Sequence, residues 1–189
     1  RRGLSSRRTK DPFSKANALH CYITKYRSTI MPAYEFELVA TLRAAGATVS
    51  TAESCTGGLV AARITSVSGA SEAFKYGAVT YCNEAKNKIL GVEKETLETL
   101  GAVSAKTAAE MAAGVRKIMN AEIGVSVTGL AGPNGGEGKP VGLVFVAVNS
   151  DKYSEVTENH FSGDRISVRN QAADKALELA LMAAKKLGE

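Results

Sequence analysis

From about residue 33 onward, the hydrophobic positions of the chain follow two alternating periods. Apolar residues recur at helical spacing over 34–45, whereas the run 47–53 is rich in the β-branched residues typical of strands. By the same criteria, helices are predicted at 57–67, 83–90, 94–100, 104–119 and 164–187. Further strands are predicted at 77–82, 123–128, 141–148 and 152–161. This alternation of helices and strands is typical of the α/β class.

The order of these elements predicts how the strands pair. Strand 141–148 is apolar throughout, and strand 152–161 follows it after a tight turn, so these two should pair antiparallel. Most other strands are separated by helices, which favours parallel pairing. We therefore predict a three-layer α/β/α sandwich on a mixed, mostly parallel five-stranded sheet. Because no repeat or linker divides residues 33–189, we expect them to form one domain.

The charge is unevenly distributed along the chain. The net charge is +5, but residues 1–30 hold eight Lys or Arg and one acidic residue, which leaves 16 basic and 18 acidic residues elsewhere. The basic character therefore belongs to an N-terminal extension, residues 1–32. Three interpretations stay open for it: a transit segment, a sequence of artificial origin ahead of a start at Met31, or an arm that packs on a neighbouring subunit. Without a basic excess in the remainder, we expect no nucleic-acid partner.

Composition also argues against several other classes of protein. No apolar run approaches the ~20 residues that span a bilayer, so no membrane partner is expected. Two His and three scattered Cys show no metal-ligand spacing, and we expect neither a metal nor another cofactor. A sparse, odd number of cysteines fits a reducing compartment. We expect a cytoplasmic protein, or an organellar one if residues 1–32 are a transit segment.

The first candidate site lies in Thr51-Ala-Glu-Ser-Cys-Thr-Gly-Gly58, between a predicted strand and a predicted helix. Such a turn brings a hydroxyl and the unpaired N–H groups of a helix N-terminus together, a suitable place for an oxyanion. Ser54 is the candidate nucleophile, and the candidate donors are the N–H groups of Cys55, Thr56, Gly57 and Gly58. Two other interpretations stay open: a helix cap without chemistry, or Cys55 as a thiolate nucleophile.

A serine nucleophile needs a base. The two histidines, His20 and His160, have no predicted placement near Ser54. Tyr81 and Lys86 stand five residues apart at a strand-to-helix junction, and a lysine can act as base when its pKa falls from ~10.4 towards ~7–8. Spacing alone, however, favours a solvated helix lysine at position 86. The G-x-S-x-G, S-x-x-K, phosphate-loop and G-x-G-x-x-G motifs are absent, which argues against the enzyme classes that use them.

Six motifs stand in one characteristic order along the chain. They are Ala52-Glu-Ser-Cys-Thr-Gly-Gly58, Tyr81-Cys-Asn-Glu-Ala-Lys86, Gly101-Ala-Val-Ser104, Val127-Thr-Gly-Leu-Ala-Gly-Pro-Asn-Gly-Gly136, Lys139-Pro-Val-Gly142 and Phe161-Ser-Gly-Asp-Arg165. In this order they resemble the C-terminal domain of the competence-damage protein CinA, a family that includes stand-alone nicotinamide mononucleotide deamidases. The resemblance covers roughly residues 34–187 and does not extend to residues 1–30.

The resemblance implies an amidohydrolase that converts nicotinamide mononucleotide and water to nicotinate mononucleotide and ammonia, in pyridine nucleotide salvage. It also implies a three-layer α/β/α fold and a homodimer or higher homo-oligomer. Within the matching motifs, the catalytic roles fall on Ser54, Lys86 and Tyr81. The residues expected to bind the nucleotide, beyond those around Ser54, are Asn83, Thr128, Gly129, Gly132 and Arg165. Arg169, one helical turn further on, is an alternative to Arg165. A catalytically silent nucleotide-binding module and a serine amidase for another small substrate remain as alternatives.

Overall fold

In the computed structural model of the protein, residues 34–189 are described. Its centre is one five-stranded sheet in the order β2-β1-β3-β4-β5. The strands are β1 (Val49–Glu53), β2 (Phe74–Val79), β3 (Ile123–Gly129), β4 (Leu143–Asn149) and β5 (Ser154–His160). The N-terminal extension lies outside the described residues, so the interpretations of residues 1–32 stay predictions.

The sheet is mixed. β1 pairs in parallel with both β2 and β3, whereas β4 pairs antiparallel with β3 and with β5. Four strands therefore run in one direction and only β4 opposes them. This confirms the predicted mixed, mostly parallel sheet, and it confirms the antiparallel pair formed by the last two strands.

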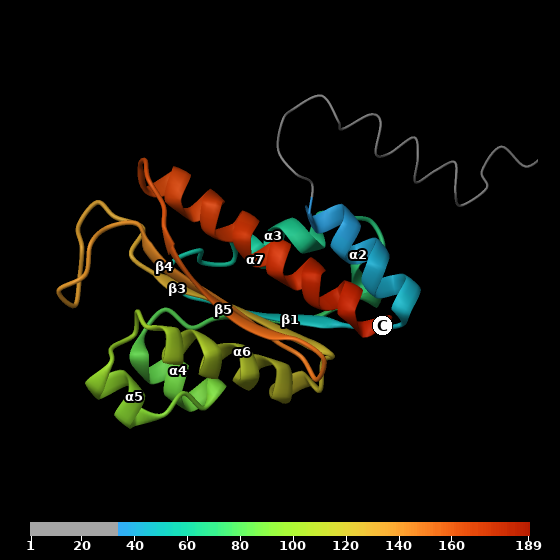
Figure 1. Ribbon diagram of the computed structural model, residues 1–189, viewed down its shortest axis with the longest axis horizontal. Helices are drawn as coiled ribbons and strands as arrows, with labels where there is room; N and C mark the ends of the chain where they lie inside the picture. The colour runs from blue at the N-terminus through green and yellow to red at the C-terminus, as the bar shows by residue number, and fades with distance from the viewer. Residues whose placement is uncertain (1–33) are drawn as a thin grey trace, which may run out of the picture. The chain divides into compact units, whose positions relative to one another are not determined.

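Helices cover both faces of the sheet (Figure 1). On one face lie α2 (Tyr34–Ala45), α3 (Leu59–Thr65) and α7 (Arg165–Leu187), which contact one another. On the other lie α4 (Asn83–Leu90), α5 (Lys94–Thr99) and α6 (Ala105–Met119), with α6 packed against β1, β3 and β4. A short 3-10 turn at Ala70–Glu72 precedes β2. The three-layer sandwich is thus confirmed.

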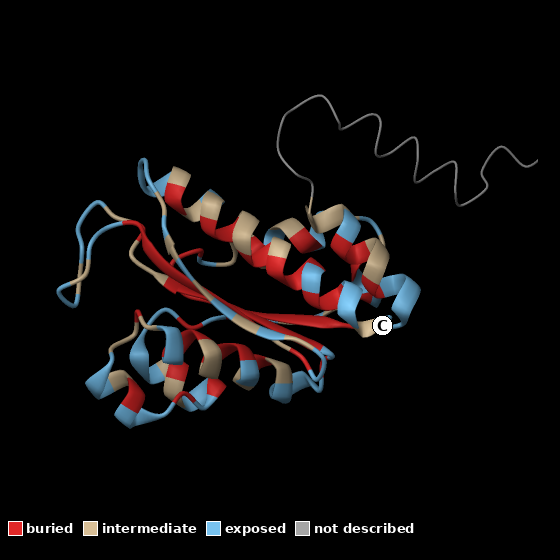
Figure 2. Cartoon of the chain, in the orientation of Figure 1, coloured by how far each residue is buried: buried red, intermediate tan, exposed pale blue. Residues whose placement is uncertain are grey.

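The core follows from this layering. The three central strands β1, β3 and β4 are buried along almost their whole length, as expected for strands covered on both faces (Figure 2). By contrast, the edge strand β5 alternates between exposed and half-buried residues. The long helix α7 buries a face made mainly of alanine and leucine side chains. Burial of these apolar surfaces is the main favourable contribution to folding.

One strand is displaced from its predicted position. We expected a strand at 77–82, but β2 spans Phe74–Val79. The reason is tertiary: a strand extends only as far as its partner, and β1 ends at Glu53, which pairs with Val79. One further hydrogen bond, from Thr80 N–H to the carbonyl of Glu53, closes the ladder. The chain then leaves the sheet towards α4.

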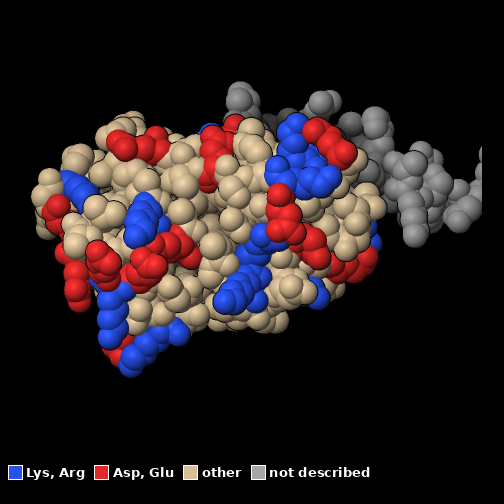
Figure 3. Space-filling view, turned by 60° about the horizontal axis from the view of Figure 1, so that its bottom comes forward, with Lys and Arg blue, Asp and Glu red and all other residues tan. Residues whose placement is uncertain are grey.

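Charged side chains of both signs are interspersed over the face shown in Figure 3. Many of them are paired across elements, such as Arg63 with Glu35 and Asp174 at 2.8 and 2.6 Å. In residues 34–189, none of the helices combines the length and the apolar character needed to cross a membrane.

Candidate active site

Ser54 stands directly after β1, at the carboxyl end of the parallel part of the sheet. Its N–H donates to the carbonyl of Val127 on β3 at 2.9 Å, which fixes the residue between two strand ends. Two glycines with left-handed φ angles, Gly57 at +58° and Gly58 at +94°, then turn the chain into α3. Only 8% of Ser54 is exposed, so its hydroxyl is held in a protected place.

Lys86 on α4 points its ammonium group at this hydroxyl. The side-chain Nζ lies 3.0 Å from Ser54 Oγ and 2.8 Å from the carbonyl oxygen of Thr80. Only 1% of Lys86 is exposed. Burial lowers the pKa of Lys86 below its ordinary value, against a smaller opposing effect from Cys82, Cys55 and Glu137. A buried amine with a lowered pKa, in contact with a serine hydroxyl, can accept its proton.

Burial has the opposite consequence for the neighbouring thiol. Cys55 is buried, and desolvation raises its pKa to about 11. A thiol with that pKa stays protonated near neutral pH, and the nucleophilic form is the thiolate. The geometry therefore favours Ser54 over Cys55 as nucleophile.

The N-terminus of α3 does not offer the free donors that we expected around Gly57 and Gly58. The carboxylate of Glu53 accepts hydrogen bonds from the N–H groups of Gly58, Val60 and Ala61 at 3.0, 3.1 and 2.9 Å. The Gly57 N–H donates to the carbonyl of Ser54. An internal carboxylate thus occupies the place of an external anion, because it compensates the same unpaired N–H groups and helix dipole. Its signal in the sequence is an acidic residue just before the helix N-terminus.

A cavity of about 320 Å³ opens beside Ser54 and Lys86. Most residues expected to bind substrate line it: Cys55, Asn83, Thr128, Gly129, Gly132 and Arg165, together with Tyr81. Thr56, Gly57 and Gly58 do not line it, so they shape the turn rather than the wall. A separate hollow of about 410 Å³ near Val67 and Phe74 is lined by no ionisable side chain. The chemistry is therefore placed in the cavity at Ser54.

Arg165 and Tyr81 meet at the mouth of the cavity. The guanidinium of Arg165 donates to the carbonyl of Gly132 at 2.6 Å and to the Tyr81 hydroxyl at 3.1 Å. Tyr81 is 61% exposed. Arg169 instead donates to the carbonyl of Thr56 at 2.6 Å, on the turn behind Ser54. Of the two arginines left open by the sequence, Arg165 is the one that lines the cavity.

The Tyr81 hydroxyl contacts neither Ser54 nor Lys86 in the described part of the chain. Its position at the rim supports a role in closing the mouth or holding a ligand. The Thr128 hydroxyl is buried and donates to the carbonyl of Ala102 at 2.7 Å. Asn83 is the first residue of α4 and directly follows Cys82.

Glu137 is the site residue that our sequence reasoning missed. It lines the cavity, and its carboxylate accepts hydrogen bonds from the N–H groups of Ala102 and Val103 at 3.0 and 3.3 Å. Burial by itself raises the pKa of Glu137, but these hydrogen bonds and Lys139 lower it overall. The residue is therefore a carboxylate at neutral pH. Its signal was a lone acidic residue in a glycine-rich loop.

No cluster of three or more His, Cys, Asp or Glu side chains suited to a metal ion occurs within residues 34–189. The site consists instead of a serine and a buried lysine in one cavity of a three-layer α/β protein. That combination defines a class of α/β proteins with a serine–lysine pair at the end of a central strand.

Comparison with known proteins then identifies the family. The chain belongs to the CinA C-terminal domain family, whose model matches residues 33–183. It is 53% identical over 133 residues to a putative competence-damage inducible protein of Acetivibrio thermocellus, an alignment that covers 70% of this chain and 32% of the relative. A CinA-like protein of Kosmotoga olearia is 52% identical over 138 residues, covering 72% and 34%. The chain thus spans about one third of the length of these curated relatives.

Solved structures share the fold over nearly their full length. The competence/damage inducible protein CihA of Agrobacterium tumefaciens matches with a TM-score of 0.77 and 40% identity, covering 82% of this chain and 98% of that one. A CinA superfamily protein of Escherichia coli matches with a TM-score of 0.75 and 34% identity, covering 84% and 95%. These matches confirm the family that the six motifs predicted.

Proposed function

We propose that this protein is a nicotinamide mononucleotide amidohydrolase, which converts its substrate and water to nicotinate mononucleotide and ammonia in pyridine nucleotide salvage. The observation that carries the proposal is the contact between a buried Lys86 amine and the Ser54 hydroxyl at 3.0 Å. A pair of this kind is suited to acyl transfer, because the amine can take and return the serine proton.

In the first half of the reaction, neutral Lys86 accepts the proton of Ser54 as Oγ attacks the carboxamide carbon. The second polar contact of Lys86, to the Thr80 carbonyl, keeps the amine aimed at the hydroxyl. The tetrahedral intermediate then collapses: the C–N bond breaks, the lysine ammonium gives its proton to the leaving nitrogen, and ammonia departs. An ester of Ser54 remains.

In the second half, Lys86 takes a proton from water, and the resulting hydroxide attacks the ester. Collapse breaks the bond to Ser54 Oγ, which regains its proton from Lys86, and the free acid leaves. Oxyanion stabilisation is worth roughly 3 kcal/mol per donor. We assign it to the N–H groups of Cys55, Ala131 and Gly132, three residues that line the cavity and whose N–H groups donate to no acceptor within the described range.

The nucleotide phosphate is assigned to Arg165, at the mouth of the cavity. A guanidinium suits phosphate because it presents a planar fork of donors. Arg165 now donates to the Gly132 carbonyl and the Tyr81 hydroxyl, which are both uncharged. Phosphate oxygens can replace these two acceptors without breaking an ion pair. Asn83, Thr128 and Gly129 would complete the wall around the ribose and the amide.

The test is ammonia release from nicotinamide mononucleotide by the purified chain and by two single variants. Ser54→Ala should lower the rate by at least about 10³-fold, since it removes the nucleophile. Cys55→Ala should retain activity within about tenfold, because a thiol with a raised pKa is not the nucleophile. The reverse pattern would reject the assignment.

Two further outcomes would reject the activity itself. Binding of the nucleotide without ammonia release would indicate a catalytically silent module. Ammonia release from another amide, with neither binding nor turnover of the mononucleotide, would indicate a serine amidase of different specificity.

A further inference from the structure

Glu137 lies in the wall of the cavity at Ser54, and the proposed chemistry makes no use of it. Its carboxylate is held by the N–H groups of Ala102 and Val103. Gly101, directly before these two residues, has no side chain and leaves room for the carboxylate beside it. The carboxylate is therefore placed by the fold rather than by chance rotation of a surface side chain.

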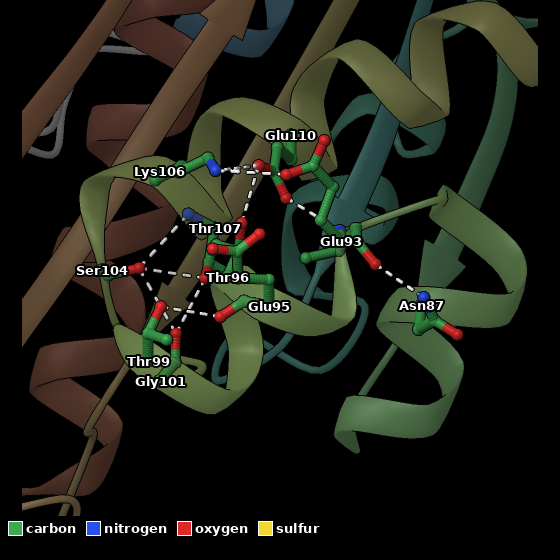
Figure 4. Close-up of polar contacts among 11 residues, drawn as sticks. Asn87, Glu93, Glu95, Thr96, Thr99, Gly101, Ser104, Lys106, Thr107 and Glu110 are labelled. Carbon is green, nitrogen blue, oxygen red and sulfur yellow. Dashed lines mark hydrogen bonds and ion pairs between the residues drawn. The ribbon is translucent and has the colours of Figure 1, made fainter.

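The segment that grips Glu137 is itself anchored to α6. The Thr107 hydroxyl donates to the carbonyl of Gly101 at 2.8 Å, and the Ser104 hydroxyl contacts the same oxygen at 3.3 Å (Figure 4). Ser104 also accepts a hydrogen bond from the N–H of Thr107, as the cap of the helix. Glu137 thus faces the cavity from a support that is fixed on two sides.

The nearest cation does not neutralise Glu137 fully. Lys139 directs its ammonium to the carbonyls of Leu100 and Val103 at 2.9 and 2.7 Å, and reaches the Glu137 carboxylate only at 3.5 Å. A carboxylate offers about four acceptor positions, and two N–H groups and one distant ammonium leave capacity unused. The side chain of Glu137 also keeps 37% of its surface exposed.

Among the described residues, Glu137 is the only carboxylate that lines this cavity. Its carboxylate shares the cavity wall with Ser54 and Lys86. Arg165 provides a positive group at the mouth. The cavity therefore has a cationic group suited to an anion and a separate anionic group in its wall.

We propose that Glu137 is a specificity residue that selects substrates whose amide-bearing ring is positively charged. This inference rests on the proposed function: in nicotinamide mononucleotide the phosphate is anionic and the pyridinium ring is cationic. The carboxylate attracts the ring while Arg165 holds the phosphate, so the two charges orient the carboxamide towards Ser54. A neutral ring with the same phosphate gains nothing from Glu137.

The test compares two ligands that differ in ring charge. Nicotinamide mononucleotide has a cationic ring, whereas its reduced, dihydropyridine form keeps the phosphate and the carboxamide on a neutral ring. Dissociation constants are measured by calorimetry in the full chain carrying Ser54→Ala, so that no turnover occurs. Glu137→Gln removes the charge and keeps an acceptor oxygen, while Glu137→Asp keeps the charge. Glu72→Gln is the matched control, because Glu72 pairs with Arg43 outside the cavity.

We expect Glu137→Gln to weaken binding of the oxidised nucleotide by about three- to tenfold and to leave the reduced form within about twofold, the scale of a partly exposed charge pair. Glu137→Asp and Glu72→Gln should keep the preference for the cationic ring. Equal weakening of both ligands, or no change in either, would overturn the inference. If the otherwise unaltered chain releases ammonia in either of these cases, the proposed function survives alone. If the Ser54→Ala chain binds neither ligand and the parent chain releases no ammonia, both proposals fail.

Discussion

At the scale of single residues, the most consequential feature is the burial of an amine. Lys86 lies in the interior with two oxygen partners, Ser54 Oγ and the Thr80 carbonyl, and no carboxylate among residues 34–189 contacts it. An unpaired charge is costly to bury, and a lysine escapes this cost by losing its proton. The same burial that lowers its pKa makes the amine a base.

The pH dependence of the reaction should report this amine. In the proposed mechanism neutral Lys86 is the active form, so kcat/KM should rise with pH and level off above a pKa that lies below the ordinary lysine value of 10.5. The same sign holds for stability. The unfolded chain binds the proton more tightly, so the contribution of Lys86 to stability grows with pH between its folded-state pKa and 10.5. A pH–rate profile with ammonia detection measures the first effect.

Substitution of Lys86 tests its role as base more directly than the pH profile does. Lys86→Arg should lower the rate by about 10²-fold or more at every pH, since arginine stays protonated. Lys88→Arg is the control: Lys88 lies on the same helix, is exposed and pairs with Glu84. A Lys86→Arg variant with normal activity would contradict the role of Lys86 as base.

How far the site could be predicted differs from residue to residue. The six motifs led to Ser54 and Lys86. Spacing alone favoured a solvated lysine at position 86, because the periodicity of a helix does not show which of its faces another segment of the chain covers. Glu53 and Glu137 were not predicted as site residues, although each has a weak local signal. An acidic residue before a helix or in a glycine-rich loop does not reveal its partners, which for Glu137 are N–H groups 34 and 35 residues away.

At the scale of elements, caps and chain ends were predictable where the signal is local. Ser104 and Asp164 cap α6 and α7 by accepting hydrogen bonds from Thr107 N–H and Ser167 N–H. The position of β2 was not predictable from local sequence, because the length of β1 determines where the pairing stops. Turn and cap chemistry is short-range, whereas strand pairing is not.

The cap at Ser104 provides a test at this scale. Ser104→Ala removes the acceptor for Thr107 N–H and should cost about 1 kcal/mol of stability. In a domain of this size, that loss corresponds to a fall of about 2–4 °C in Tm. Ser104→Asp keeps a capping oxygen and should stay close to the parent chain. Thermal unfolding followed by circular dichroism measures both, and an equal Tm for the alanine and aspartate variants would contradict the role of the cap.

At the scale of the whole molecule, residues 34–189 form a sandwich in which β2 is an edge strand. Its outer side pairs with no strand in the described part of the chain. Near the cavity mouth, Val79 at the end of β2 and Ile166 beside Arg165 are both exposed. Exposed large apolar side chains and an unpaired strand edge are commonly buried when a protein associates with another chain. They support the expectation of a homo-oligomer, which the family resemblance implies.

The mass in solution tests this expectation. Light scattering on the 189-residue chain at micromolar concentration should give at least twice the 19.8 kDa of one protomer. Val79→Glu places a charge on the exposed edge and should shift the distribution towards the protomer if that edge is the contact. A parent mass near 19.8 kDa would contradict the prediction.

The order of amino acids was enough to predict the α/β class, the order of helices and strands, the antiparallel last pair, the family and the serine–lysine motif. These properties depend on periodicity, on turn residues and on motifs that lie close together along the chain. The tertiary structure alone decided that Lys86 is buried against Ser54, that Glu53 fills the helix N-terminus, that Arg165 rather than Arg169 lines the cavity, and that Glu137 faces it. The placements of Lys86, Arg165 and Glu137 depend on which distant segments meet, and that is settled only when the helices pack on both faces of the sheet and exclude water between them. The contact of Glu53 depends on how the short turn between β1 and α3 folds back on the strand end.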